Sequence, residues 1–185
     1  VLQRADNVLN VLARSEREGQ LWLVADSKLM LSVLLRNDET KEQLVNSLSS
    51  RLRGLCGDSV NIEQLPYHLA ASAVRDFEAY GDEYMAIEAL TVAASCATQK
   101  GDFEFALLLL DSAMLRINSY YNKYYPNDGL LPLILSDVEE EGESSRIECD
   151  SIDNICECML SVRREASCAY AGVGDKYASD VNRNA

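Results

Sequence analysis

The sequence has little of what usually interrupts a helix and little of what usually performs catalysis. Its 185 residues include 3 Pro, 9 Gly and 1 His. With 48% hydrophobic and 25% charged residues, the composition excludes collagen-like, low-complexity and wholly disordered chains. No stretch approaches the roughly 18 consecutive apolar residues that a membrane-spanning helix needs, and no signal peptide is recognisable. We therefore expect a globular chain without direct membrane insertion.

Charge of one sign prevails, with 30 acidic against 17 basic residues and a formal net charge of −13. Nucleic-acid binding needs clustered Lys and Arg, so we expect no nucleic-acid partner, and attraction to anionic lipid is disfavoured for the same reason. Much of the charge is local, because residues 137–153 contain eight carboxylates and one Arg. This stretch predicts an acidic loop within an insertion at about 126–150.

Apolar residues recur at steps of three and four through most of the chain, the pattern of amphipathic helices. The stripes and the turns between them predict an all-α protein, a single helical-repeat domain over residues 1–185. We expect four antiparallel hairpins, at about 2–36, 38–80, 83–125 and 151–185. The chain begins without Met and its last helix is short, so we also expect a fragment of a longer chain.

The third hairpin carries the most specific pattern. Only Gly101-Asp102 separates two Ala- and Leu-rich segments that contain neither Pro nor Gly. Helices that cross closely need small residues at the contact and large ones beside it, and the tetratricopeptide repeat places them so. Glycine turns also recur along the chain, at Gly19, Gly57, Gly101 and Gly174. We predict a tetratricopeptide-like α-solenoid, for which the matching residues are Gly101, Phe103, Ala106, Leu110 and Ala113.

No constellation predicts a reaction. The six cysteines lack the paired spacing of a zinc site, and the single His68 stands far from most of them. We expect them to be thiols, with Cys96 in the core, Cys158 and Cys168 facing neighbouring helices and Cys156 near the surface. The acidic stretch echoes a calcium loop, but a solvated loop is the favoured interpretation. We therefore expect no catalytic residue, no metal and no cofactor.

Aromatic residues are the best candidates for a partner surface. Tyr pairs spaced by four share one helix face, so two can pack inward while two point outward. Tyr and Trp are enriched where proteins bind one another. Packing inside the protein is the favoured interpretation for each of them, and a partner surface is the alternative. The candidate residues are Trp22, Tyr120, Tyr121, Tyr124 and Tyr125.

Two stretches, Ser15 to Arg36 and Ser161 to Ala185, resemble the tetratricopeptide-like sensor regions that precede the transmembrane helix in two-component histidine kinases of Bacteroides-type bacteria. The resemblance implies an extracytoplasmic, periplasmic sensor domain of a membrane-anchored protein. It also implies that the parent chain is a histidine kinase that acts in signal transduction. None of the kinase's own motifs lies in these residues. Because thiols are typical of a reducing compartment, a cytoplasmic location stays the alternative.

The leading hypothesis is a non-catalytic sensor and protein-interaction domain with a protein or peptide partner on a concave face. The alternative is a structural spacer or dimerisation module of a multidomain protein, which would make the chain a homodimer. An enzyme is the least favoured class, because neither a general base nor a metal site is visible in the sequence.

Overall fold

The computed structural model describes residues 1–56, 61–124 and 143–184. These residues form eight α-helices and a short 3-10 helix, and they contain no strand. The prediction of an all-α protein is therefore confirmed. The elements are α1 (Leu2–Glu18), α2 (Leu21–Arg36), α3 (Asp38–Cys56), η1 (Ile62–Gln64), α4 (Leu65–Tyr80), α5 (Glu83–Gln99), α6 (Phe103–Tyr124), α7 (Glu143–Gly172) and α8 (Lys176–Asn184).

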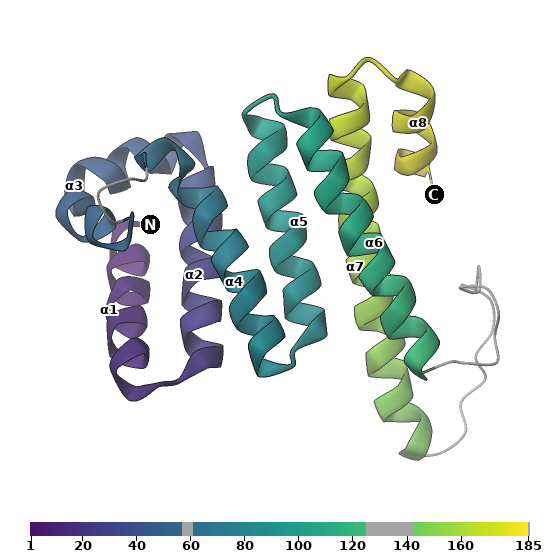
Figure 1. The fold of residues 1–185 in the computed structure, drawn as a ribbon, viewed down its shortest axis with the longest axis horizontal. Helices are drawn as coiled ribbons and strands as arrows, with labels where there is room; N and C mark the ends of the chain where they lie inside the picture. Colours follow the sequence, from purple (N-terminus) through teal and green to yellow (C-terminus); the bar gives the residue numbers. More distant parts are fainter. Residues whose placement is uncertain (57–60, 125–142, 185) are drawn as a thin grey trace.

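Most of the helices stand side by side in a row (Figure 1). Along this row α1 packs on α2, α2 on α4, α4 on α5, and α5 on α6. The long helix α7 lies against both α5 and α6, and the short α8 packs on α7 near the C-terminus. The row therefore has a different helix at each end, α1 at one and α8 at the other.

Two-residue glycine-aspartate turns join several neighbours in the row. At Gly101, with φ 79°, the amide of Asp102 donates to the Ala97 carbonyl, which closes the end of α5 in a left-handed cap. The Asp102 carboxylate then accepts from the Phe105 amide at 3.4 Å at the start of α6. One dipeptide thus ends a helix and begins the next. The same closure occurs at Gly19, Gly81 and Gly174, and Gly57 lies outside the described residues.

The second expected hairpin, 38–80, differs from a simple antiparallel pair. Helix α3 packs on α1, α2 and η1, whereas α4 packs on α2 and α5. The backbone of α3 is also bent at Leu48, where φ is −120° and ψ is 17°. The reason lies in α2, whose two buried faces accept α1 and α3 on one side and α4 on the other.

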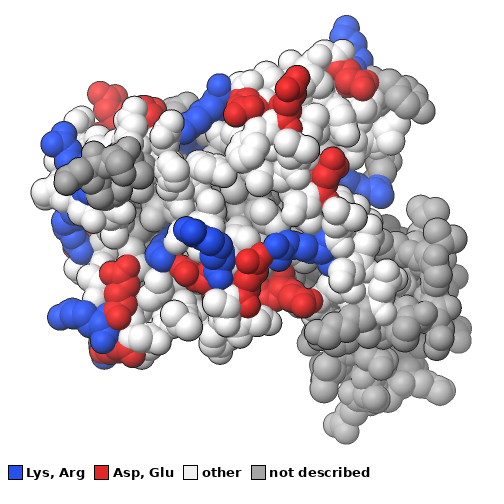
Figure 2. Space-filling model, in the orientation of Figure 1, with Lys and Arg blue, Asp and Glu red and all other residues white. Residues whose placement is uncertain are grey.

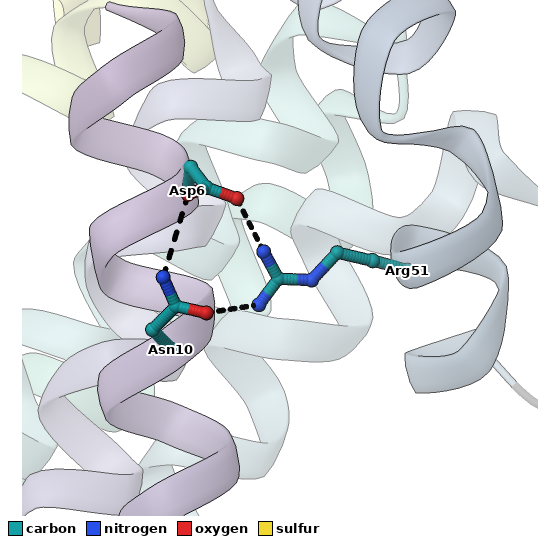
Figure 3. A network of polar contacts seen from close by, with 3 residues as sticks. All are labelled: Asp6, Asn10 and Arg51. Atoms are coloured by element: carbon teal, nitrogen blue, oxygen red, sulfur yellow. Dashed lines mark hydrogen bonds and ion pairs between the residues drawn. The ribbon is translucent and has the colours of Figure 1, made fainter.

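A polar network fixes α3 onto α1 (Figure 3). The Arg51 guanidinium forms an ion pair with Asp6 and donates to the Asn10 side-chain carbonyl at 2.9 Å. Asn10 in turn donates to Asp6 at 3.4 Å. The side chains of Arg51 and Asp6 are 36% and 45% exposed, so the network orients α3 more than it stabilises the fold.

The interior consists of two hydrophobic clusters that share α2 and α4. The N-terminal cluster joins α1, α2, α3 and the start of α4, and its buried residues are Ala5, Val8, Leu9, Leu12, Val24, Leu31, Leu35, Leu44, Leu52, Leu65 and Leu69. The C-terminal cluster joins α2, α4, α5, α6 and α7 around residues such as Phe77, Ala94, Ala106 and Ala113. The small residues expected at the α5–α6 contact, Ala106 and Ala113, are buried at 0% exposure, and so is Ala94 on α5.

The last part of the predicted acidic loop is helical. Helix α7 begins at Glu143, so residues 143–150 are helical and the prediction of a loop there is wrong. These residues contain neither Pro nor Gly, so nothing in their sequence interrupts the helix on its N-terminal side. Residues 126–142 of the expected insertion lie outside the described residues, and so do Asp137, Glu139, Glu141 and Gly142 of the calcium-loop echo.

Candidate binding surface on α6, α7 and α8

A cavity of about 250 Å³ opens between α6, α7 and α8. Its inner wall is apolar and is formed by the buried side chains of Leu110, Val162 and Ala166. Its polar groups come from each of the three helices. The lining residues are Leu107, Leu110, Asp111, Met114, Val162, Arg163, Ala166, Tyr170, Val181 and Asn182.

Two close contacts hold the walls of this cavity in place. The buried Ser179 hydroxyl donates to the Ser167 carbonyl at 2.9 Å, which ties the short α8 to α7. Gly172, at the end of α7, lies directly beneath the Phe103 ring, and a Cβ added at this glycine would stand 2.3 Å from a ring carbon. Only glycine leaves room for this ring, so the residue fixes how closely α6 approaches α7.

One acidic and one basic side chain line the cavity from opposite helices. Asp111 belongs to α6 and Arg163 to α7. Neither side chain has an ion-pair or hydrogen-bond partner among the described residues. Both charges are therefore available to a ligand, and their opposite signs suit a ligand that itself carries both, as peptides do.

Large apolar side chains on the three helices that form the cavity face solvent. On α6, Leu108 is 65% exposed and Leu115 is 70% exposed, and both lie one helical turn from Asp111. Leu160 on α7 and Val181 on α8 are also exposed. Single exposed leucines are ordinary, but a group of them around a cavity is typical of a binding site. We call the cavity and these four residues the α6–α8 surface.

The aromatic residues predicted from the sequence lie elsewhere. Trp22 is half-buried on α2, stands edge-to-face with Phe77 at 6.1 Å between ring centroids, and donates from its indole nitrogen to Asp82 at 3.0 Å. Tyr121 is buried at 6% exposure, and Tyr120 packs against the C-terminal cluster. The side chains of Tyr124 and Tyr125 lie outside those that the structure describes. The predicted surface is thus not assembled as one patch by the residues that are described.

Cys96, Cys158 and Cys168 are free thiols, and Cys156 is half-buried. Cys96 is in the core, as predicted, and Cys158 is buried beside α5. The expectation that Cys168 faces a neighbouring helix is wrong, because its side chain is exposed. Burial, reinforced by Glu88 and Glu157, raises the pKa of the Cys158 thiol to about 12, so it stays protonated and is a poor nucleophile.

Glu88 and Glu157 bring two carboxylates together between α5 and α7. Burial raises the pKa of Glu88, and the nearby charge of Glu157 raises it further. Tyr84, beside them, has its pKa raised to about 12, mainly by burial. When two like charges lie close together in a partly buried position, each disfavours the ionised form of the other. Within the described residues no group of three or more His, Cys, Asp or Glu is placed to hold a metal ion.

The charges on the outer surface are mixed. On the face that Figure 2 presents, Lys and Arg lie interspersed with Asp and Glu, and wide uncharged areas separate them. This face offers no continuous basic stripe of the kind that follows a nucleic-acid backbone. In the part of the chain that the structure describes, no helix combines the length and the apolar character needed to cross a bilayer.

The α6–α8 surface could not be predicted from the sequence pattern, because the exposure of a side chain depends on the tertiary fold. A signal was nevertheless present in residues 107–110, which are four consecutive leucines. Such a run places apolar side chains all around α6, whereas packing on one or two neighbours needs only part of the circumference. The run therefore implies that some of these leucines face solvent.

A larger cavity of about 520 Å³ lies between α1 and α2. It is a groove along the first helix pair, lined by residues that include Arg4, Val8, Asp26 and Met30. Burial raises the pKa of Asp26. The groove belongs to the first end of the row, far along the chain from the α6–α8 surface.

Comparison with known proteins separates these two ends. A family model with the description "Domain of unknown function (DUF5113)" matches residues 80–185. The matched range is more than half of the chain and contains α5, α6, α7 and α8. No curated protein and no solved structure matches the chain.

Proposed function

The chain belongs to the DUF5113 family of domains of unknown function, and we propose that it is a non-catalytic sensor and protein-interaction domain that binds a protein or peptide through the α6–α8 surface. The whole of this surface lies within residues 80–185, the part of the chain that the family shares. The α1–α2 groove lies outside that range. The family match therefore favours the α6–α8 surface over the larger cavity.

The observation that carries the proposal is the exposure of Leu108 and Leu115 beside the cavity. At 65% and 70% exposure, these side chains cost free energy in water, about 25 cal/mol for each Å² of apolar surface that a partner would cover. The neighbouring cavity offers Asp111 and Arg163 to polar groups of the same partner. Apolar contacts combined with a few oriented polar groups are usual in protein-binding sites.

The helical repeat supplies the platform for this surface. Tight turns of the same design join α1 to α2, α4 to α5, α5 to α6 and α7 to α8. A tetratricopeptide-like α-solenoid is the architecture that we propose for these elements, with its binding face at the C-terminal end. Stacked helical hairpins form extended rigid surfaces that bind other proteins without chemistry of their own.

The parent protein in this proposal is a two-component sensor histidine kinase, and the domain is its extracytoplasmic, signal-sensing part. The support is the resemblance of residues 15–36 and 161–185 to the sensor regions of such kinases. The reading frame that follows residue 185 tests this part. We expect it to encode a membrane-spanning helix and then a kinase core, and a stop codon directly after residue 185 would contradict it.

Selection of peptides tests the binding function. A displayed library of random peptides is selected on the whole chain, and each enriched peptide is then measured on two variants. We expect the double variant Leu108→Asp/Leu115→Asp to lose at least about tenfold in affinity, because each change places a charge where an apolar contact forms.

The matched control is Leu21→Asp. Leu21 is also an exposed leucine, at 51%, but it lies at the start of α2. Peptides should bind this variant as they bind the unchanged chain. Equal binding to all three proteins would contradict a partner site at the α6–α8 surface.

The alternative function, a dimerisation module, uses the same exposed leucines. Light scattering of the unchanged chain distinguishes the two functions, because a partner-binding domain is a monomer alone. A dimer that dissociates in Leu108→Asp/Leu115→Asp and persists in Leu21→Asp would replace the peptide-binding proposal with this alternative.

A further inference from the structure

A third cavity lies where α2, α3, η1, α4 and α5 meet, and it has a volume of about 140 Å³. This space holds several water molecules of about 30 Å³ each. It is far smaller than the roughly 300–1,000 Å³ of sites for larger ligands. Only a compact ligand fits. The lining residues are Leu35, Arg36, Lys41, Glu63, Pro66, Cys96, Gln99 and Lys100.

The lining is basic although the protein is acidic. Arg36, Lys41 and Lys100 face a single carboxylate, Glu63, so the eight residues carry three positive charges and one negative charge. The whole chain has a net charge of −13. A concave site of one sign concentrates ions of the opposite sign, and here that ion is an anion.

The cations act together. Lys41 forms an ion pair with Glu63, and the pKa of Glu63 is lowered first by this hydrogen bond and then by the charges of Lys41 and Lys100. The positive charges of Arg36 and Lys100 both lower the pKa of the Cys96 thiol, against the larger effect of burial. Neither Arg36 nor Lys100 has an ion-pair partner within the described part of the chain. The positive charges of these two side chains are therefore available to an anion.

The floor of the cavity does not oppose an anion. Leu35, Pro66 and Cys96 are buried. Burial raises the pKa of the Cys96 thiol above its ordinary value, against the smaller opposing effects of Ser32, Arg36 and Lys100. The thiol is therefore neutral at pH 7. Low-dielectric walls of this kind strengthen the field of the cations at the rim.

The electrostatic effects of the helix ends around the cavity largely cancel. Helices α2 and α5 end here, at Arg36 and Gln99, and their C-termini repel anions. Helix α3 and the η1–α4 segment begin here, and their N-termini attract anions to a similar extent. The side-chain charges thus decide the sign of the potential.

We propose that this cavity binds a small oxyanion of about the size of phosphate, between the side chains of Arg36, Lys41 and Lys100. The guanidinium of Arg36 supplies paired N–H donors, and the two ammonium groups supply point charges. Glu63 competes with the ligand for Lys41. The proposal is independent of the α6–α8 surface, because it uses none of the same residues.

Titration calorimetry with inorganic phosphate, at constant ionic strength, tests the site on the whole chain. We expect one phosphate per chain. Arg36→Gln and Lys100→Gln should each weaken binding about tenfold or more, since each removes a charged hydrogen-bond donor. Lys100→Arg keeps the charge and should keep the affinity.

Glu63→Gln provides a test in the opposite direction. It removes the competing carboxylate and releases Lys41, so phosphate should bind several-fold more tightly than to the unchanged chain. A variant that merely damaged the fold could not bind more tightly. The controls are Arg53→Gln and Lys176→Gln, two exposed cations outside the cavity, which should leave the affinity unchanged.

Three results would overturn the proposal. The first is no binding to the unchanged chain at millimolar phosphate. The second is equal weakening by the control variants, which would mean that phosphate responds only to overall charge. The third is weaker binding in Glu63→Gln.

Discussion

The two hydrophobic clusters of the protein are built from different residues. Of the 11 buried residues of the N-terminal cluster that the structure describes, eight are leucines and one is alanine. Of the 21 described residues of the C-terminal cluster, ten are alanines. Alanine brings helix axes close together, whereas leucine fills the wider space between helices that stand further apart. The two ends of the row are therefore held by different kinds of packing.

Because of this difference, the two clusters should be sensitive to different kinds of substitution. Close alanine contacts are disturbed by added atoms, and leucine contacts by removed atoms. The alanine-rich cluster lies mostly in the part that the family shares and supports the α6–α8 surface. A closely packed support holds exposed leucines at fixed positions, and a fixed surface loses less conformational entropy when it binds a partner.

Truncation in the N-terminal cluster should have the largest effect. Leu12 is 1% exposed, and Leu12→Ala should lower the free energy of unfolding by about 2–5 kcal/mol through lost burial and the cavity that remains. Urea denaturation measures the change. The control is the neighbouring Val11, 44% exposed, where substitution by Ala should change stability by about 0.5 kcal/mol or less. Similar losses for both variants would mean that this cluster is not closely packed.

Enlargement in the C-terminal cluster should come next. Ala113 is 0% exposed in the centre of α6, and Ala113→Leu should cost about 1–3 kcal/mol because the added atoms force α5 and α6 apart. The matched control is Ala13→Leu on the exposed face of α1, which should be close to neutral. If Ala113→Leu stabilised the protein, the contrast between the clusters would be broken.

The carboxylates between α5 and α7 predict a pH effect confined to the C-terminal cluster. The pKa of Glu88 is raised in the folded protein, first by burial and then by Glu157. Between the ordinary pKa of Glu, about 4.3, and this raised value, the folded state holds a proton that the unfolded chain has released. Stability therefore falls as pH rises through this window and stays lower above it.

Glu88→Gln removes the titrating group, so it should stabilise the protein at pH 7 and have little effect at a pH below the ordinary pKa of Glu. Urea denaturation at several pH values gives the curve. Glu42→Gln, on the exposed face of α3, is the control and should not change its slope. A constant difference at every pH would show that the charge of Glu88 is not the cause.

The polar network at the other end should have the smallest effect. Arg51 pairs with Asp6 while both side chains are partly exposed, so Arg51→Ala should cost about 0–1 kcal/mol and less at high salt. Denaturation at low and at high ionic strength measures both quantities. A loss of several kcal/mol that salt does not change would place Arg51 among the residues that hold the N-terminal cluster together.

Local features of the sequence predict much of this fold. The turns at Gly101 and Gly174 follow from glycine and from the aspartate that caps the next helix, and Ala106 and Ala113 follow from spacing alone. The position of α4 does not follow, because α3 and α4 compete for contact with α2, and only the complete set of packed faces decides between them. The bend at Leu48 is equally invisible in the sequence.

Sites were harder to predict than helices. Trp22 and Tyr121 are good candidates by residue type, but their neighbours bury them to a large extent. Leu108 and Leu115 are ordinary by type and become informative only because the fold leaves them exposed. The basic cavity gathers Arg36, Lys41, Glu63 and Lys100 from segments far apart in the chain, and no spacing rule connects such residues.

Hydrogen exchange with a selected peptide tests the central claim, partner binding at the α6–α8 surface, most directly. The account predicts that the peptide slows amide exchange in α6, α7 and α8, with no change in α1, α2 and α3. Slower exchange in the α1–α2 groove, or protection spread evenly over all helices, would contradict it.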